Sequence, residues 1–203
     1  MYSLYPRLNK CTEQREETRL QKSSIRMMVT VISFTSLGIG FLGPAYSMFV
    51  VRRFSASLLH AGILSAIFLS ISAFFKMPAG RLVDLYGRWK VLFAGVIGCA
   101  LSSLSYIFAS ELIHLYLIEF FFGISFALQR PALLALMMVM SGKLNRGLRL
   151  GIFDSTDDFA GAFAALLSGI VVSSLGFEPL FLLCFSCYSI SGLFILNSRT
   201  EIG

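Results

Sequence analysis

Long runs of apolar residues, separated by short polar segments, divide the chain from residue 27 onward. A helix needs about 20 consecutive apolar residues to cross about 30 Å of hydrocarbon, and six runs reach that length. The runs lack the period-two alternation of strands, and backbone in lipid must be helical or in a closed barrel. The sequence therefore predicts six transmembrane helices, at about 27–51, 57–78, 91–109, 112–139, 150–173 and 179–197.

The composition is that of a membrane protein. Hydrophobic residues make up 56% and charged residues 14% of the 203 residues, against about 45–50% and about 25% in ordinary globular domains. When a soluble domain of this size folds, roughly a third of the surface of the unfolded chain stays exposed to water. So many apolar side chains could not all be buried in such a domain, which excludes a soluble enzyme. The net charge of +6 does not indicate nucleic acid, because the basic residues stand in short runs between apolar stretches and not on one solvated face. We expect lipid, and no nucleic acid, as a partner.

The polar segments predict the orientation in the membrane. With residues 1–26 inside, thirteen Lys and Arg residues fall in inner segments, and only Arg52 and Arg53 fall in an outer loop. Cytoplasmic loops are the ones enriched in Lys and Arg, so we predict that both termini are cytoplasmic. The expected organisation is a basic cytosolic tail at 1–26, a six-span bundle at 27–197 and a cytosolic C-terminal tail at 198–203.

A motif occupies the loop between the second and third predicted spans, where residues 80–90 read GRLVDLYGRWK. Here Gly80 lets another backbone come close, Gly87 permits a turn with positive φ, and Asp84 can pair with Arg88 one helical turn later. The loop resembles the signature of the major facilitator superfamily of transporters, usually written GxLADRxGRKK. The matching residues are Gly80, Leu82, Asp84, Gly87, Arg88 and Lys90.

The resemblance covers all six predicted spans and implies an all-α integral membrane fold equal to one six-helix half of the family's fold. It implies transport of a small-molecule substrate by alternating access, in the plasma membrane. Since the family's fold uses two bundles, we expect a homodimer or a separately encoded second half. The signature recurs in both halves, so which half this chain resembles stays open. The alternative function is that of a truncated, non-transporting membrane protein that acts as an interaction or regulatory element.

Two charged residues lie within the fourth predicted span. Glu119 and Arg130 are eleven residues apart, which places them on one helix face about 16 Å apart. Charged groups in spans cost about 2.5–3.5 kcal/mol on insertion scales and usually face a bundle interior or an aqueous cavity. By the resemblance, this span lines the substrate pathway, with Glu119 toward the outside. The alternatives are a structural ion pair for Arg130 and hydration near the interface for Glu119.

An acidic stripe of Asp154, Asp157 and Asp158 stands at the inner end of the fifth predicted span. Asp157 and Asp158 lie about 12 Å above the start of that helix, at a depth similar to that of Arg130. We therefore expect that Arg130 can pair with one of these aspartates, either as a structural contact or as a gate. Lys76 either reaches the interface by snorkelling or pairs with the stripe. The candidate substrate or proton pathway consists of Glu119, Arg130, Asp154, Asp157 and Asp158.

Small residues mark two further features. Gly43 and Pro44 in the first span are similar to the glycine-and-proline break of the family's first helix, so the resemblance implies a helix break there. Broken helices line the cavities of transporters. Gly161, Ala165 and Gly169 recur every four residues in the fifth span and predict close helix packing, either within the bundle or against a second bundle. We see no catalytic constellation and no phosphate-binding loop, and we expect no enzyme activity, metal or cofactor.

Overall fold

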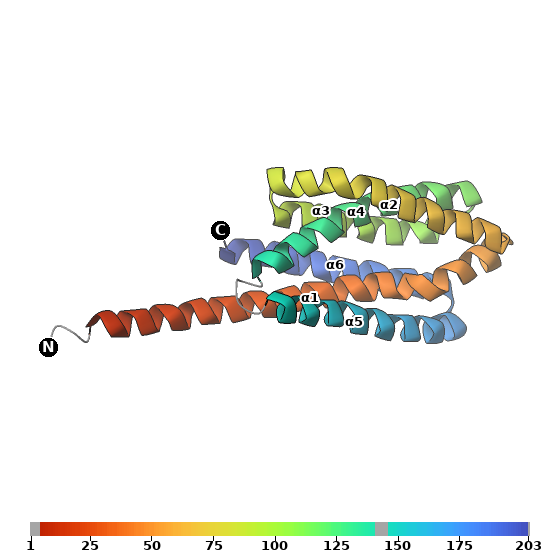
Figure 1. Ribbon diagram of the computed structural model, residues 1–203. Coiled ribbons are helices and arrows are strands. Elements are labelled where there is room, and N and C mark those ends of the chain that lie inside the picture. Colours follow the sequence, from red (N-terminus) through yellow and green to blue (C-terminus); the bar gives the residue numbers. More distant parts are fainter. Residues whose placement is uncertain (1–4, 141–145, 203) are drawn as a thin grey trace.

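The structure, a computed structural model, describes residues 5–140 and 146–202. These residues form six α-helices and one 3-10 turn, without any strand (Figure 1). All six helices contain a stretch long and apolar enough to cross a membrane, which confirms the predicted all-helical fold with six spans. The elements are α1 (Tyr5–Phe54), α2 (Leu58–Tyr86), α3 (Arg88–Ser105), η1 (Tyr106–Phe108), α4 (Leu112–Met140), α5 (Arg146–Leu175) and α6 (Phe177–Ile202).

α1 is much longer than a membrane crossing requires. It contains 50 residues, or about 75 Å of helix at 1.5 Å per residue. Its first half projects beyond the bundle, and the end of α6 lies on the same side (Figure 1). An even number of crossings returns a chain to the side on which it began, so this placement fits six spans. That this side is cytoplasmic remains a prediction from the charge distribution.

The first three helices and the last three pack in the same pattern. α2 lies along α4 as α5 lies along α1, α3 packs on α4 as α6 packs on α1, and α3 and α6 contact each other between them. The connections repeat as well, because the single residues Gly87 and Gly176 join α2 to α3 and α5 to α6. Both have φ +91°, a backbone conformation that glycine adopts readily. The chain therefore contains an internal three-plus-three repeat.

α2 and α5 lie at opposite edges of the bundle (Figure 1). In the apolar 18-residue stretch of each span, only 17% is buried in α2 and 11% in α5, against 33–50% in the other four spans. α1 and α4 make few direct contacts with each other, so the bundle is loosely closed along the side between them. The edge helices are consequently the ones with faces available to lipid or to another protein.

Glycine allows the closest helix contacts. A Cβ atom added to Gly40 of α1 would lie 2.7 Å from the carbonyl oxygen of Gly161 in α5. At the equivalent contact between α4 and α2, a Cβ atom added to Gly123 of α4 would lie 3.1 Å from the carbonyl oxygen of Phe68 in α2. Helices in lipid are held by such close packing, because lipid tails are as apolar as the side chains. The first contact leaves no room for any side chain.

α1 continues as a helix through Gly43 and Pro44 instead of breaking there as the sequence predicted. A proline removes one N–H from the helical hydrogen bonds, and its ring crowds the preceding turn, which bending relieves. Figure 1 shows the last turns of α1 directed away from its earlier course. The feature is a bend in a continuous helix.

Candidate functional site

α4 places an acid and a base on one of its faces. Glu119 has 4% of its surface exposed, and Arg130 lies about 16 Å further along the helix axis. A charged or polar group inside an apolar bundle needs a partner to offset its desolvation. The two residues find different partners, so the site consists of an acid end around Glu119 and a base end around Arg130.

At the acid end, Glu119 is hydrogen-bonded to Tyr106. The Tyr106 hydroxyl donates to Oε1 of Glu119 at 2.7 Å, and Tyr106 is 1% exposed. This tyrosine is the first residue of η1, the short turn that follows α3, so the turn brings its ring against α4. Tyr106 also contacts Tyr46 and Phe122, with ring centroids 5.7 Å and 6.5 Å away. The acid therefore lies among aromatic rings.

A cavity of about 220 Å³ adjoins Glu119 between α1, α2 and α4. Its walls are apolar or aromatic apart from Glu119, Ser65 and two tyrosine hydroxyls. Tyr46 is buried in this wall, and its hydroxyl has no hydrogen-bond partner in the part of the chain that the structure describes. Gly43 and Leu69 line the cavity and are exposed, so it opens between α1 and α2.

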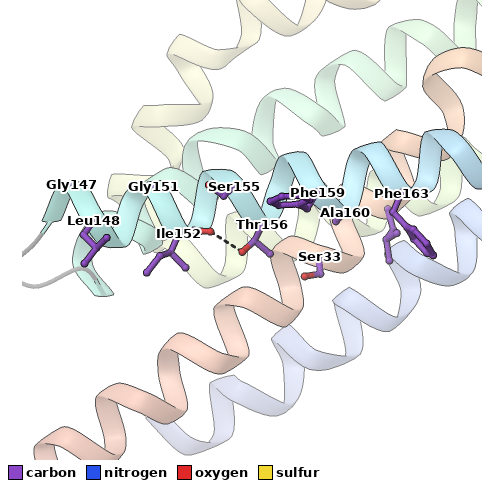
Figure 2. Close-up of a pocket in the computed structure, with 11 residues that line it drawn as sticks. Ser33, Gly147, Leu148, Gly151, Ile152, Ser155, Thr156, Phe159, Ala160 and Phe163 are labelled. Carbon is purple, nitrogen blue, oxygen red and sulfur yellow. Dashed lines mark hydrogen bonds between the residues drawn. The ribbon is translucent and has the colours of Figure 1, made fainter.

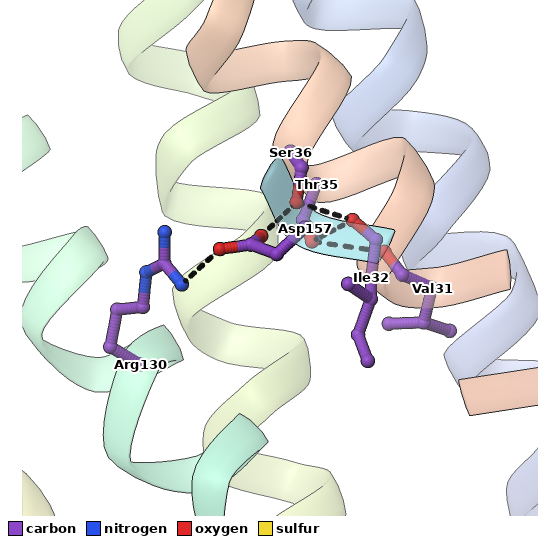
Figure 3. A network of polar contacts seen from close by, with 6 residues as sticks. All are labelled: Val31, Ile32, Thr35, Ser36, Arg130 and Asp157. Atoms are coloured by element: carbon purple, nitrogen blue, oxygen red, sulfur yellow. Dashed lines mark hydrogen bonds and ion pairs between the residues drawn. The ribbon is translucent and has the colours of Figure 1, made fainter. Parts of the chain in front are cut away.

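At the base end, a polar network links three helices (Figure 3). Nη1 of Arg130 in α4 lies 2.9 Å from Oδ2 of Asp157 in α5, and their side chains are 32% and 17% exposed. The hydroxyl of Ser36 in α1 donates to Oδ1 of the same aspartate. The ion pair expected between Arg130 and one of the three aspartates is thus confirmed for Asp157. Among residues 25–140 and 147–197 it is the single ion pair.

Phe126 lies beside two cations of this region. The guanidinium carbon of Arg130 is 5.1 Å from its ring centroid, and Nζ of Lys76 is 5.9 Å away. Contacts of this kind contribute about 0.5–2 kcal/mol. Lys76 is exposed on α2 and forms no ion pair with a described side chain, so it does not pair with the acidic stripe.

The other two aspartates of the stripe are directed away from the network. Asp154 and Asp158 are exposed, and neither pairs with a base whose side chain the structure describes. Neighbouring residues of a helix are rotated by about 100°, so only Asp157 of the three faces both α1 and α4. Of the five candidate pathway residues, the structure brings together Arg130 and Asp157.

The signature loop makes the turn from α2 to α3. Gly87 alone separates the helices, and its N–H donates to the carbonyl of Val83 at 3.1 Å. Asp84 and Arg88 do not form the expected pair, because the turn at Gly87 places them on different helices. Gly80 and Leu82 are partly buried, whereas Asp84, Gly87, Arg88 and Lys90 are exposed.

The small residues of α5 lie only partly against the bundle. The backbone of Gly161 meets α1 at Gly40, as described above. Ala165 is half-buried and Gly169 is exposed, and a Cβ atom at Gly169 would meet no atom within 4 Å. This shoulder of α5, Gly161, Ala165 and Gly169, is therefore left largely uncovered.

A wider groove follows α5 beside α1 (Figure 2). It has a volume of about 930 Å³ and is lined mostly by apolar residues, with Ser33, Ser155 and Thr156 as its hydroxyls. The Thr156 hydroxyl donates to the carbonyl of Ile152 at 2.7 Å, so that group is satisfied within its own helix. An apolar surface on a membrane span is covered by lipid without further cause, and we assign no ligand to this groove.

Three residues of the site were missed by the sequence analysis. Tyr46, Tyr106 and Ser36 contribute hydroxyls from apolar stretches, where the one available signal is a polar atom within a span. In the described ranges, no three His, Cys, Asp or Glu side chains are grouped as ligands for a metal ion.

Comparisons with known proteins bear on the whole bundle. The family model described as Major Facilitator Superfamily matches residues 28–201. An uncharacterized MFS-type transporter of Methanocaldococcus jannaschii is 25% identical over 166 residues, which are 82% of this chain and 42% of that protein. The class H tetracycline resistance protein of Pasteurella multocida is 31% identical over 103 residues, covering 50% and 25% of the two chains. The class B protein of Escherichia coli is 32% identical over 106 residues, covering 51% and 26%. The chain spans less than half the length of each of these relatives.

Proposed function

Because the chain belongs to the major facilitator superfamily, we propose that it moves a small solute across the membrane by alternating access, as one bundle that works with a second. Family membership assigns it to membrane transport proteins rather than to enzymes. It is a multi-pass membrane protein with six apolar helices. The solute, the second bundle and the alternation between two open states are the parts that we propose.

The observation that carries the transport proposal is the buried carboxyl of Glu119 beside an open cavity. Glu119 stands about 10 Å from the start of α4, well within a span. An acidic group is costly there, and such groups usually face a functional site or an aqueous cavity. Alternating access also needs a contact that breaks as the cavity changes sides. Arg130 and Asp157 supply a candidate, because they bridge α4 and α5, which make few other contacts.

The uncovered shoulders of α2 and α5 support pairing with a second bundle. Small residues with open space beside them follow one side of α2, as Gly161, Ala165 and Gly169 do in α5. Small residues let helices of two bundles approach closely. The residues of the α2 shoulder are Gly62, Ala66, Ala73 and Gly80.

Charge complementarity favours a second copy of this chain as the partner. Lys76 lies about 15 Å before the end of α2, and Asp158 lies about 18 Å after the start of α5, at 1.5 Å per residue. Since α2 and α5 run in opposite directions through the membrane, these exposed opposite charges stand at similar depths. A twofold axis along the membrane normal would bring α2 of one copy against α5 of the other, which gives the self-complementary contact that twofold dimers have.

Spin labels test pairing and alternation together without knowledge of the solute. Labels would be placed at Leu148 or at Leu175, exposed residues near the two ends of α5, in a chain whose natural cysteines are replaced. In proteoliposomes we expect two distances between the labels of the two copies at each position, one for each open state. Asp157→Asn should increase the fraction of molecules at one distance and decrease the fraction at the other. Asp154→Asn is the control and should leave both fractions unchanged.

Two outcomes would contradict the proposal. Absence of any coupling between labels at all protein concentrations excludes a homodimer, and co-purification of another six-span protein would then identify a second half. A single distance at both positions that Asp157→Asn does not change contradicts alternating access and favours an interaction or regulatory role.

A transport assay tests the solute pathway. Two relatives are named tetracycline resistance proteins, so tetracycline is the first probe for uptake into proteoliposomes. We expect Glu119→Gln to abolish uptake and Glu111→Gln, the same change at an exposed residue just before α4, to leave it unchanged. Equal uptake by the two variants would remove Glu119 from the pathway.

A further inference from the structure

The cavity beside Glu119 contains an acid without a basic partner. Glu119 is the one acidic or basic side chain in its lining, and it is buried. The nearest base on the same helix face, Arg130, lies three turns away and is paired with Asp157. A buried carboxyl is stabilised either by taking up a proton or by pairing with a cation, and no described base at this cavity supplies that cation.

Two tyrosine hydroxyls stand beside the Glu119 carboxyl in this cavity. Tyr106 donates to one carboxyl oxygen of Glu119, and the Tyr46 hydroxyl also interacts with this carboxyl. The buried hydroxyl of Tyr46 nevertheless forms no well-formed hydrogen bond with a described residue. An unpartnered buried hydroxyl is costly, so its place in a cavity wall indicates a site that a bound molecule completes.

Aromatic rings form much of the remaining wall. Phe68 and Phe122 line the cavity and stack on each other, with ring centroids 5.3 Å apart, and Tyr46 and Tyr106 continue the wall. The face of an aromatic ring carries partial negative charge and attracts a cation within about 6 Å. Carboxyl and rings together favour an organic cation and disfavour an anion.

The size of the cavity indicates which part of such a molecule enters. At about 220 Å³, it is smaller than the roughly 300–1,000 Å³ of pockets that enclose drug-sized ligands. It opens at Gly43 and Leu69, which are exposed. A head group fits inside while the rest of the molecule extends through the opening.

We propose that this cavity binds the ammonium head group of an amphipathic organic cation, with Glu119 as its counter-ion and Phe68, Phe122 and Tyr46 as its walls. The inference deepens the proposed function and rests on it for its physiological role, because it names the class of solute. Binding is measured separately from transport, so the two proposals fail independently.

The test uses the full chain in detergent and tritiated benzyltrimethylammonium. Benzyl alcohol and benzoate carry the same ring with no charge and with a negative charge, and serve as competitors. We expect saturable binding of the cation that neither competitor displaces. Glu119→Gln keeps the side-chain volume and an oxygen that accepts from Tyr106, and it should weaken binding about tenfold or more. Phe122→Leu should weaken it about two- to fivefold.

Matched controls separate the cavity from general charge. Glu111→Gln and Glu178→Gln remove exposed carboxylates outside the cavity and should leave the affinity unchanged. If Glu119→Gln does not fold, as judged by its elution and thermal unfolding, Phe122→Leu and the titration with competitors decide the question.

Clear results overturn the proposal. Absence of saturable binding, equal affinity in Glu119→Gln, or equal competition by benzyl alcohol would each do so, and Glu119 would then serve a proton or the fold alone. Saturable binding of benzyltrimethylammonium without its uptake into proteoliposomes would support the cation site and contradict transport of this solute. Uptake of tetracycline without binding of the cation would support transport and contradict the cation site.

Discussion

Arg130 and Asp157 are 27 residues apart in the sequence, yet Nη1 of the arginine lies 2.9 Å from Oδ2 of the aspartate. This pair joins α4 to α5, and the hydroxyl of Ser36 extends it to α1. The network therefore crosses from one repeat of three helices to the other. It lies on the same face of α4 as the Glu119 cavity, about 16 Å away.

We expect Asp157→Asn to lower the free energy of unfolding by about 1–3 kcal/mol, between the values for exposed and buried pairs, because the pair is partly shielded. Thermal unfolding in detergent measures the change. Asp154→Asn is the control, with an expected effect within about 0.5 kcal/mol. Exchange of the charges, Arg130→Asp with Asp157→Arg, should recover part of the loss; equal stability of the two asparagine variants would show that the pair contributes nothing.

Gly40→Ala is expected to destabilise the bundle by about 1–3 kcal/mol, because the added methyl group would be forced against the carbonyl oxygen of Gly161. Gly151→Ala makes the same change in α5 at a position with open space around it. That variant should be neutral, or more stable by up to about 1 kcal/mol, since alanine favours helix more than glycine does. Unfolding in a graded detergent series compares the two, and equal stability would contradict the close approach of α1 and α5.

Tyr106→Phe removes the hydroxyl that donates to Glu119 and leaves a buried acceptor unsatisfied, at an expected cost of about 1–3 kcal/mol. Tyr188→Phe is the matched control, because the buried hydroxyl of Tyr188 has no described partner. Its loss should be neutral or slightly stabilising. The difference in melting temperature between the two variants measures the hydrogen bond, and the opposite order would refute it.

The predicted orientation can be read from alkaline phosphatase fusions. A fusion after Ala56, in the connection from α1 to α2, should be active because that connection is expected outside the cytoplasm. A fusion after Tyr86, at the end of α2, should be inactive. The reverse pattern would place both termini outside the cytoplasm and invalidate the charge argument.

The helices were predictable because membrane crossing depends on length and hydrophobicity, which a single sequence displays directly. The depth of the ion pair in the membrane was predictable, because a helix rises by a fixed distance per residue. The aspartate that pairs with Arg130 was not predictable, since Asp157 and Asp158 lie at nearly the same depth and point in different directions around the helix. That direction depends on how α5 is rotated against α1, which the contact between Gly40 and Gly161 fixes.

The acid end was only half visible in the sequence. Glu119 stands out as a charge in a span, but nothing near Tyr106 in the sequence indicates that a short turn brings its ring onto α4. Tyr46 comes from a third helix, and its approach depends on the packing of the whole bundle. At Gly43 and Pro44 the sequence pattern was correct about irregularity and wrong about its form, because a helix can absorb a proline by bending.

The single glycines between α2 and α3 and between α5 and α6 restrict how the bundle can deform. A linker of one residue advances the chain by about 3.8 Å, less than one helical turn of 5.4 Å, so neither helix of such a pair can slide a full turn past the other. What remains is tilting about the joined ends. One of these pivots lies on each side of the membrane, so an inclination that widens one mouth of the bundle narrows the opposite mouth.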